Sequence, residues 1–140
     1  MFNRILLAVD GSDHALNAAR TAGELARTLK AEMLRIVIAY DPIPAYLGEP
    51  NLQQAIDARL QEANFILQKA EEAVGEQNIK VHTELIEGSP AAAILAVAET
   101  RQSDLIIMGS RGLGPLTGAL LGSTSQKVIS HAPCPVLIVR

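Results

Sequence analysis

The stretch RILLAVDGSD, from Arg4 to Asp13, is the best guide to the fold. It begins with the short apolar run Arg4–Val9, which is typical of a strand buried on both faces. The DGSD segment that follows offers Ser12 or Asp13 as the N-cap of a helix. Beyond it, apolar residues recur at the spacing of one helical face. These positions are Ala15, Ala18, Ala19, Ala22, Leu25, Ala26 and Leu29. A buried strand that leads directly into a helix favours a parallel α/β architecture.

The next part of the chain repeats this alternation. Met33–Tyr40 is rich in β-branched residues and predicts a second strand. Asp41–Pro50 contains three prolines and a glycine and therefore predicts a loop. A long apolar periodicity predicts a helix from Leu52 to Gln77. Lys80–Gly88 alternates polar and apolar residues, which indicates a strand near the edge of a sheet.

The last part of the chain predicts two more helices and two more strands. Ser89 followed by Pro90 is an N-cap with proline at the first helical position, and it opens a helix that extends to about Thr100. The remaining elements are a buried strand at Leu105–Gly109, a helix at Ser123–His131 and a final apolar strand in Pro135–Arg140. We interpret residues 1–140 as one domain, because no linker, repeat or low-complexity segment divides them.

This element order predicts an open, mostly parallel five-stranded sheet with helices on both faces, as in Rossmann-like folds. The first and fourth strands are uniformly apolar and belong inside the sheet, whereas the third fits one edge. The strand order 3-2-1-4-5 satisfies these requirements. The fifth strand then forms the other edge, although it is apolar throughout. We expect a homodimer that pairs through this strand, while cover by a helix or loop stays an alternative. Its residues are Val136, Leu137, Ile138 and Val139.

The composition excludes several classes of protein. The net charge is −3 and the lysines and arginines form no stripe, which argues against a nucleic-acid surface. No apolar run approaches the roughly 20 residues that span a bilayer. The apolar run before Asp10 is too short for a signal peptide, and the single Cys134 suits a reducing compartment, so we expect a cytoplasmic protein. Three histidines lack metal-ligand spacing, and we predict no metal site built from protein residues alone: His14, His82 and His131.

The most unusual segment is GSRGLGPLTGALLGSTSQKV, from Gly109 to Val128, which holds five of the ten glycines. In a parallel sheet, ligands bind beyond the carboxyl ends of the strands where the winding reverses. If the first and fourth strands are neighbours, Asp10 faces Gly109 across such a crevice. Gly122 adjoins a helix N-terminus, whose free N–H groups favour phosphate.

The hydroxyl groups after Gly122 extend this argument. Ser123, Thr124 and Ser125 are candidate donors to a phosphate, whereas Asp10 suits ribose hydroxyls or a bound Mg²⁺. A second interpretation stays open, in which Ser123 caps the last helix and the glycines serve packing and turns. The two common nucleotide fingerprints are absent. No lysine follows a glycine, and the G-x-G-x-x-G pattern that begins at Gly112 fails at Thr117.

Three motifs together resemble the universal stress protein family, specifically its ATP-binding branch. They are LLAVDGS near the start, G-x2-G-x9-G-[ST] in the glycine-rich segment, and HAPCPVLIVR at the end. The resemblance covers the whole chain. It implies an α/β fold with strand order 3-2-1-4-5, ATP in the crevice with Mg²⁺ or Mn²⁺, and dimers through the last strand.

The resemblance also implies roles for individual residues. Asp10 corresponds to the ribose contact and Ala39 to the backbone position that binds adenine. The phosphate-binding positions correspond to Gly109, Gly112, Gly122, Ser123 and Thr124, with Arg111 and Ser125 as further candidates. We therefore expect an ATP-binding stress-response or signalling module and not an enzyme. Slow ATP hydrolysis and a nucleotide-free structural role are the alternatives.

Overall fold

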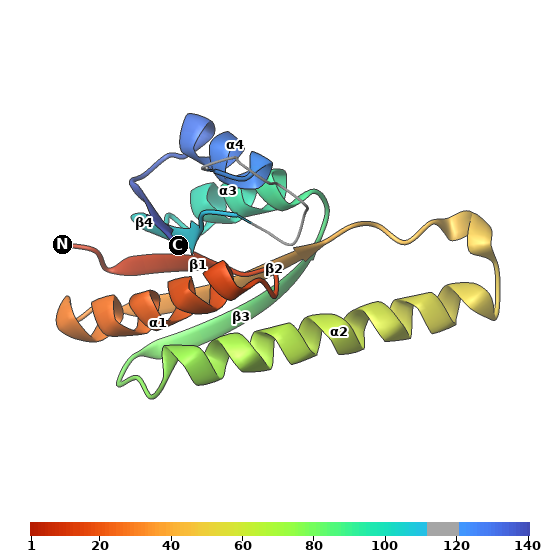
Figure 1. Ribbon diagram of the computed structural model, residues 1–140, viewed down its shortest axis with the longest axis horizontal. Coiled ribbons are helices and arrows are strands. Elements are labelled where there is room, and N and C mark those ends of the chain that lie inside the picture. The colour runs from red at the N-terminus through yellow and green to blue at the C-terminus, as the bar shows by residue number, and fades with distance from the viewer. Residues whose placement is uncertain (112–120) are drawn as a thin grey trace.

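The computed structural model describes residues 1–111 and 121–140, which form an open parallel sheet between two layers of helices (Figure 1). The strand order is β3-β2-β1-β4-β5, as the sequence predicts. The elements are β1 (Arg4–Ala8), α1 (Asp13–Thr28), β2 (Met33–Tyr40), a 3-10 turn (Ala45–Leu47), α2 (Asn51–Val74), β3 (Lys80–Glu87), α3 (Pro90–Thr100), β4 (Leu105–Gly109), α4 (Ser123–His131) and β5 (Val136–Val139).

The helix boundaries follow from local chemistry. Ser12 is the N-cap of α1, and its hydroxyl accepts a hydrogen bond from the Ala15 N–H at 3.1 Å. The second helix ends at Val74, before the predicted Gln77, because Gly75 turns the chain at a φ of +76°. The predicted loop between β2 and α2 holds the 3-10 turn, where Tyr46 is 87% exposed.

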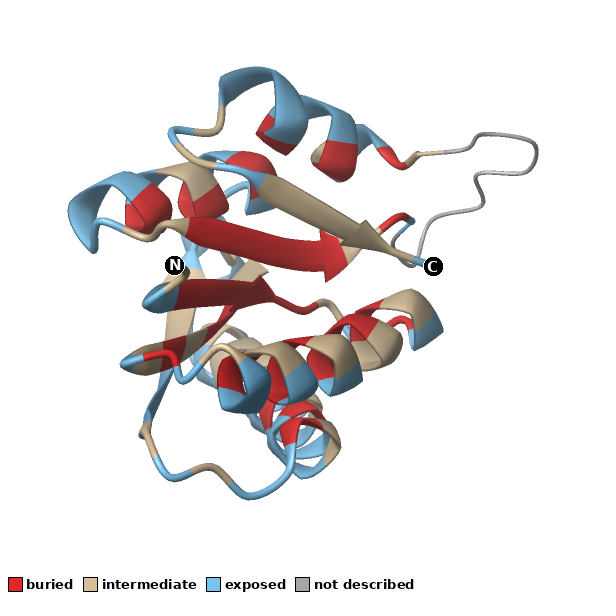
Figure 2. Ribbon diagram, turned by 90° about the vertical axis from the view of Figure 1, so that its left-hand side faces the viewer, coloured by how far each residue is buried: buried red, intermediate tan, exposed pale blue. Residues whose placement is uncertain are grey.

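The sheet separates two apolar cores, and buried residues gather along the inner strands (Figure 2). Alternate residues of β1, such as Leu7, pack under α1 and α2 on one face. The intervening residues, such as Leu6, pack under α3 and α4 on the other face. Both residues are fully buried, as expected for the central strand of a parallel sheet. The alanine-rich face of α1 lets this helix approach the sheet closely.

The two sheet edges differ in polarity. The first four residues of β3 are exposed, which confirms that this strand lies at a polar edge. All four residues of β5 are half-buried and apolar, so the opposite edge carries an apolar strand, as predicted. Asn17 of α1 contacts the end of this edge, where its side-chain amide donates to the carbonyl oxygen of Arg140 at 2.9 Å. The dimer stays a prediction.

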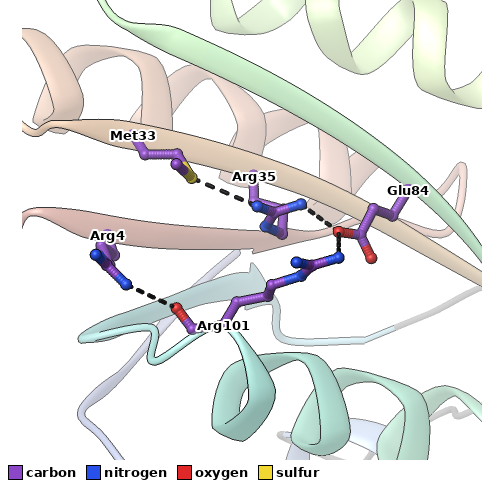
Figure 3. Close-up of polar contacts among 5 residues, drawn as sticks. All are labelled: Arg4, Met33, Arg35, Glu84 and Arg101. Atoms are coloured by element: carbon purple, nitrogen blue, oxygen red, sulfur yellow. Dashed lines mark hydrogen bonds and ion pairs between the residues drawn. The ribbon is translucent and has the colours of Figure 1, made fainter.

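An arginine cluster ties α3 to the sheet at the end opposite the carboxyl ends of the strands (Figure 3). Glu84 of β3 accepts from Arg35 of β2, and the same carboxylate oxygen lies 3.4 Å from Arg101, the C-cap of α3. Arg4 of β1 donates to the Arg101 carbonyl oxygen at 3.4 Å. No local sequence pattern indicates this cluster, because its members lie far apart along the chain. Within the described residues, no helix is long and apolar enough to cross a membrane.

Candidate functional site

The winding of the sheet reverses at β1. From β1 the chain crosses to β2 on one side, and it later returns to β4 on the other side of β1. Ala8 pairs with Val37 of β2 and with Met108 of β4, so the carboxyl ends of the three strands meet at one edge. Asp10 and Gly109 therefore lie at the same edge, as the sequence analysis expected. Such a reversal point is where open α/β sheets bind ligands.

The turn after β1 is held by its own polar groups. The Asp10 carboxylate accepts a hydrogen bond from the Ser12 N–H at 2.9 Å, and Gly11 between them has a φ of +87°. The Ser12 hydroxyl also donates to the carbonyl oxygen of Arg111 at 3.4 Å. This turn therefore connects β1, the start of α1 and the beginning of the glycine-rich segment. Asp10 itself is half-buried and reaches solvent.

Gly109 is required by the approach of β4 to the first turn of α1. A Cβ atom at this position would lie 2.9 Å from the backbone and the Cβ of His14 and 3.0 Å from the Ala15 nitrogen. The close packing of α1 against the end of β4 therefore explains why a glycine stands here.

His14 also lies at this edge, although the spacing of the histidines argued against it as a metal ligand. Its Nδ1 shares a hydrogen bond with the hydroxyl of Ser110, and the two atoms are 2.7 Å apart. Ser110 is 2% exposed. Its position could have indicated this, because His14 stands in the first turn of a helix that begins at the carboxyl edge of the sheet. Across residues 1–111 and 121–140, no three metal-ligating side chains gather into a possible metal site.

The start of α4 returns to the same edge. The Gly122 N–H donates to the Ser110 carbonyl oxygen at 2.7 Å, and Gly122 is the N-cap. The N-cap Gly122 has no side chain that could cap this helix, and Ser123 is the first helical residue, so the interpretation of Ser123 as its cap is wrong. Ser123 is exposed and Thr124 is half-buried, whereas Ser125 is buried. The structure therefore separates three hydroxyl groups that look equivalent in the sequence.

The Ser125 side chain is hydrogen-bonded to the backbone at the end of β4. Its hydroxyl donates to the Gly109 carbonyl oxygen at 2.9 Å and lies 3.3 Å from the Ser110 carbonyl oxygen. These contacts tie the first turn of α4 to the end of the strand. Ser125 is thus placed to support the edge rather than to present a hydroxyl to solvent.

The other predicted site residues lie at or beside this edge. Ala39 is half-buried near the end of β2, two residues beyond Val37, and pairs with Ile86 of β3. Arg111 is exposed directly after Ser110. Gly112 lies outside the described residues.

Two helix N-termini at this edge differ in charge and capping. α1 is capped by Ser12 and carries Asp13 in its first turn. α4 has no side-chain cap and no acidic residue in its first turn. Free N–H groups and the helix dipole favour an anion, so the start of α4 is the better anion site. Asp10, on the α1 side, suits neutral hydroxyl groups instead.

Cys134, just before β5, stays outside this arrangement. Burial, with a smaller contribution from the negative charge of Asp104, raises the pKa of its thiol. The thiol is therefore protonated at neutral pH and is a poor nucleophile. Its side chain packs against the core under α3 and α4.

The fold and this edge define a parallel α/β protein of the kind that binds ligands at the reversal point of its sheet. The universal stress protein family model matches residues 1–140. A universal stress protein of Thermus aquaticus, encoded in the QAH/OAS sulfhydrylase 3′ region, is 47% identical over 140 residues that cover 100% of both chains. The chain therefore belongs to the universal stress protein family.

Solved structures agree with this assignment. The universal stress protein UspA from Lactobacillus plantarum superposes with a TM-score of 0.86 at 28% identity, over 99% of this chain and 98% of that one. A universal stress protein solved in complex with cAMP gives a TM-score of 0.68 at 32% identity, over 99% of this chain and 97% of that one. Both comparisons support the single-domain α/β fold with its strand order.

Proposed function

We propose that this protein binds ATP at the carboxyl edge of β1 and β4 and acts as a nucleotide-dependent stress-response or signalling module. One observation carries the proposal: the fold brings Asp10, Gly109 and the uncapped N-terminus of α4 to the point where the sheet winding reverses. A related protein with cAMP bound adds support for an adenine nucleotide.

The proposed roles follow the polarity of the edge. The phosphates bind at the α4 side, where free N–H groups and the Ser123 and Thr124 hydroxyls are available as donors. The ribose hydroxyls donate to the Asp10 carboxylate, and the backbone at Ala39 binds adenine. Gly109, Gly112 and Gly122 allow the nucleotide to approach the main chain, with Arg111 beside them. Ser125 holds α4 against β4 and contributes through that support.

A divalent cation fits this proposal only as a companion of the nucleotide. The described residues contain no cluster of three metal-ligating side chains. Mg²⁺ is commonly held by one or two carboxylates together with the phosphates of its nucleotide. Because we assign Asp10 to the ribose, the phosphates and water would supply the ligands of Mg²⁺ or Mn²⁺ at this edge.

Binding without rapid turnover is the activity that the residues favour. Phosphoryl transfer needs a group that positions water and groups that stabilise charge at the terminal phosphate. The segment from Gly109 to Gly122 contains neither Glu nor Gln. His14, in the first turn of α1 at this edge, is hydrogen-bonded to Ser110 through its Nδ1. We therefore propose that nucleotide occupancy, rather than hydrolysis, carries the signal.

We also propose that the protein is a homodimer that pairs through β5. The strand lies at an edge of the sheet and is apolar at all four positions, and such an edge invites pairing with a second chain. Leu137→Lys is expected to give monomers, because it places a charge in the proposed interface. Sedimentation velocity is the measurement, and a variant that stays dimeric contradicts this interface.

Isothermal titration with ATP and Mg²⁺ tests the nucleotide proposal. Asp10→Asn is expected to weaken ATP binding by about tenfold, which corresponds to ~1.4 kcal/mol. Asp13→Asn is the matched control, because Asp13 is an exposed aspartate three residues away in the first turn of α1. Mass spectrometry of ligands released from the purified protein identifies the nucleotide. Equal effects of the two variants, or no binding by the wild-type protein, would contradict the proposal.

A further inference from the structure

A cavity lies between α1 and α2, next to the turn after β1. Its volume is about 240 Å³. Its inner residues are almost fully buried, with Ala15 at 3% exposure and Ala70 at 1%. Leu16 and Ile66 complete the apolar walls. Ser12 also lines the cavity, but its hydroxyl already accepts from the Ala15 N–H, so the walls left to a ligand are mainly apolar and suit an apolar group.

Gly11 is exposed and lies at the rim of this cavity. A Cβ atom at Gly11 would lie 3.1 Å from the Ile66 side chain, so any larger residue would enter the space between the two helices. The cavity is larger than the roughly 150 Å³ apolar cavity that takes up benzene. It therefore has room for one aromatic ring or a short acyl chain, and no room for a nucleotide.

One cationic side chain stands at the outer end of the cavity. Lys69 lies with its Nζ 5.5 Å from the centre of the Phe65 ring, and Phe65 is 61% exposed. An ion pair joins Lys69 to Glu72 at 3.7 Å, and both side chains are at least half exposed. Exposed pairs of this kind contribute little to stability, so a carboxylate in the cavity can replace Glu72 at small cost.

We propose that this cavity binds a small amphipathic carboxylate. Its apolar body, a short acyl chain or a single ring, packs between Leu16, Ile66 and Ala70. Its carboxylate pairs with the ammonium group of Lys69 beside Phe65. The binding energy comes mainly from the apolar surface removed from water, and Lys69 selects the anionic head group.

Octanoate is the probe for this site, with octan-1-ol as the neutral match and acetate as the match without a chain. In a titration followed by amide NMR without nucleotide, we expect saturable octanoate shifts at Gly11, Leu16 and Ala70, weaker octanol binding and no acetate binding. Leu16→Trp fills the cavity from its half-buried rim and is expected to weaken octanoate binding at least tenfold.

The charge is tested separately. Lys69→Met keeps an apolar stem and is expected to remove the preference for octanoate over octanol. Lys127→Met, at an exposed lysine of α4, is the matched control and is expected to keep it. The melting temperature of each variant checks its folding.

Failure of octanoate to shift these amides, unchanged binding in Leu16→Trp, or an unchanged preference in Lys69→Met would each overturn the proposal. Shifts that grow with protein concentration alone would point to a second copy in the cavity and would also overturn it. Because no nucleotide is present, none of these results bears on the ATP proposal.

Discussion

The first turns of α1 and α4 begin at the same edge of the sheet, yet the chain treats them in opposite ways. The N-terminus of α1 is capped, because the Ser12 hydroxyl accepts from the Ala15 N–H, and Asp13 adds a negative charge to the first turn. α4 begins at Gly122, with neither a side-chain cap nor an acidic residue in its first turn. Both helices would otherwise offer similar N–H groups to an anion.

This contrast separates the half of the edge that is structural from the half that we propose is available to a ligand. The N-terminus of α1 is already satisfied, and the Ser12 hydroxyl also contacts the Arg111 carbonyl oxygen. Ser125 and the Gly122 N–H tie the start of α4 to the end of β4 and to Ser110, and the N-cap Gly122 has no side chain to cover the first-turn N–H groups. We therefore assign the anion to α4 and the ribose to the Asp10 side.

We expect the greatest loss of ATP affinity when a side chain blocks the N-terminus of α4. Gly122→Val places a branched side chain at a buried N-cap, in front of the N–H groups that we assign to phosphate. We expect ATP affinity to fall by about 100-fold or more, which corresponds to ~2.7 kcal/mol. Isothermal titration measures the affinity, and thermal unfolding checks that the fold remains. Ala92→Val, at an exposed position in the first turn of α3, is the control, and unchanged affinity in Gly122→Val would count against the assignment.

A smaller effect is expected at the contact between β4 and α1. Gly109→Ala adds a Cβ within 3.0 Å of the α1 backbone, so the helix or the strand end must shift. We expect a loss of about 1–3 kcal/mol in the free energy of unfolding, as for other overpacked sites. Urea denaturation is the measurement. Ala96→Ser, on the exposed side of α3, is expected to change little, and a Gly109→Ala protein as stable as the wild type would contradict the reason given for this glycine.

The comparison is sharpened by removing one hydroxyl from each helix start. Ser12→Ala removes a cap and is expected to cost about 1 kcal/mol of stability. Ser123→Ala removes an exposed hydroxyl that caps nothing and is expected to change stability by less than about 0.5 kcal/mol. Ser123→Ala should instead weaken ATP binding modestly. If both variants lose equal stability, the two helix starts are alike and the assignment fails.

The fold was predictable because its signals are local. Apolar runs such as Leu105–Gly109 are buried strands, and Ser12 and Pro90 stand where α1 and α3 begin. The end of α2 was placed too late, because the apolar periodicity continues past the residue at which Gly75 turns the chain. The order of the strands followed from the polarity of β3 and the apolar character of β1 and β4.

The site was predictable in outline and not in its contacts. The positions of Asp10 and Gly109 at one edge follow from strand order alone. The roles of Ser123 and Ser125 differ because the first turn of α4 directs one side chain to solvent and the other to the β4 carbonyl groups. The pairing of His14 with Ser110 joins residues 96 positions apart, and no local pattern indicates it. The cavity between α1 and α2 depends on how the two helices pack, and the apolar periodicity of each helix does not specify that packing.

An ATP titration followed by backbone amide NMR tests the central claim most directly, because it compares the two helix starts in one experiment. We predict that the largest shifts occur at Gly122, Ser123 and Thr124, and that the amides of Asp13 and His14 shift much less. Larger shifts in the first turn of α1, or none at either helix, would contradict the assignment of the phosphates to α4.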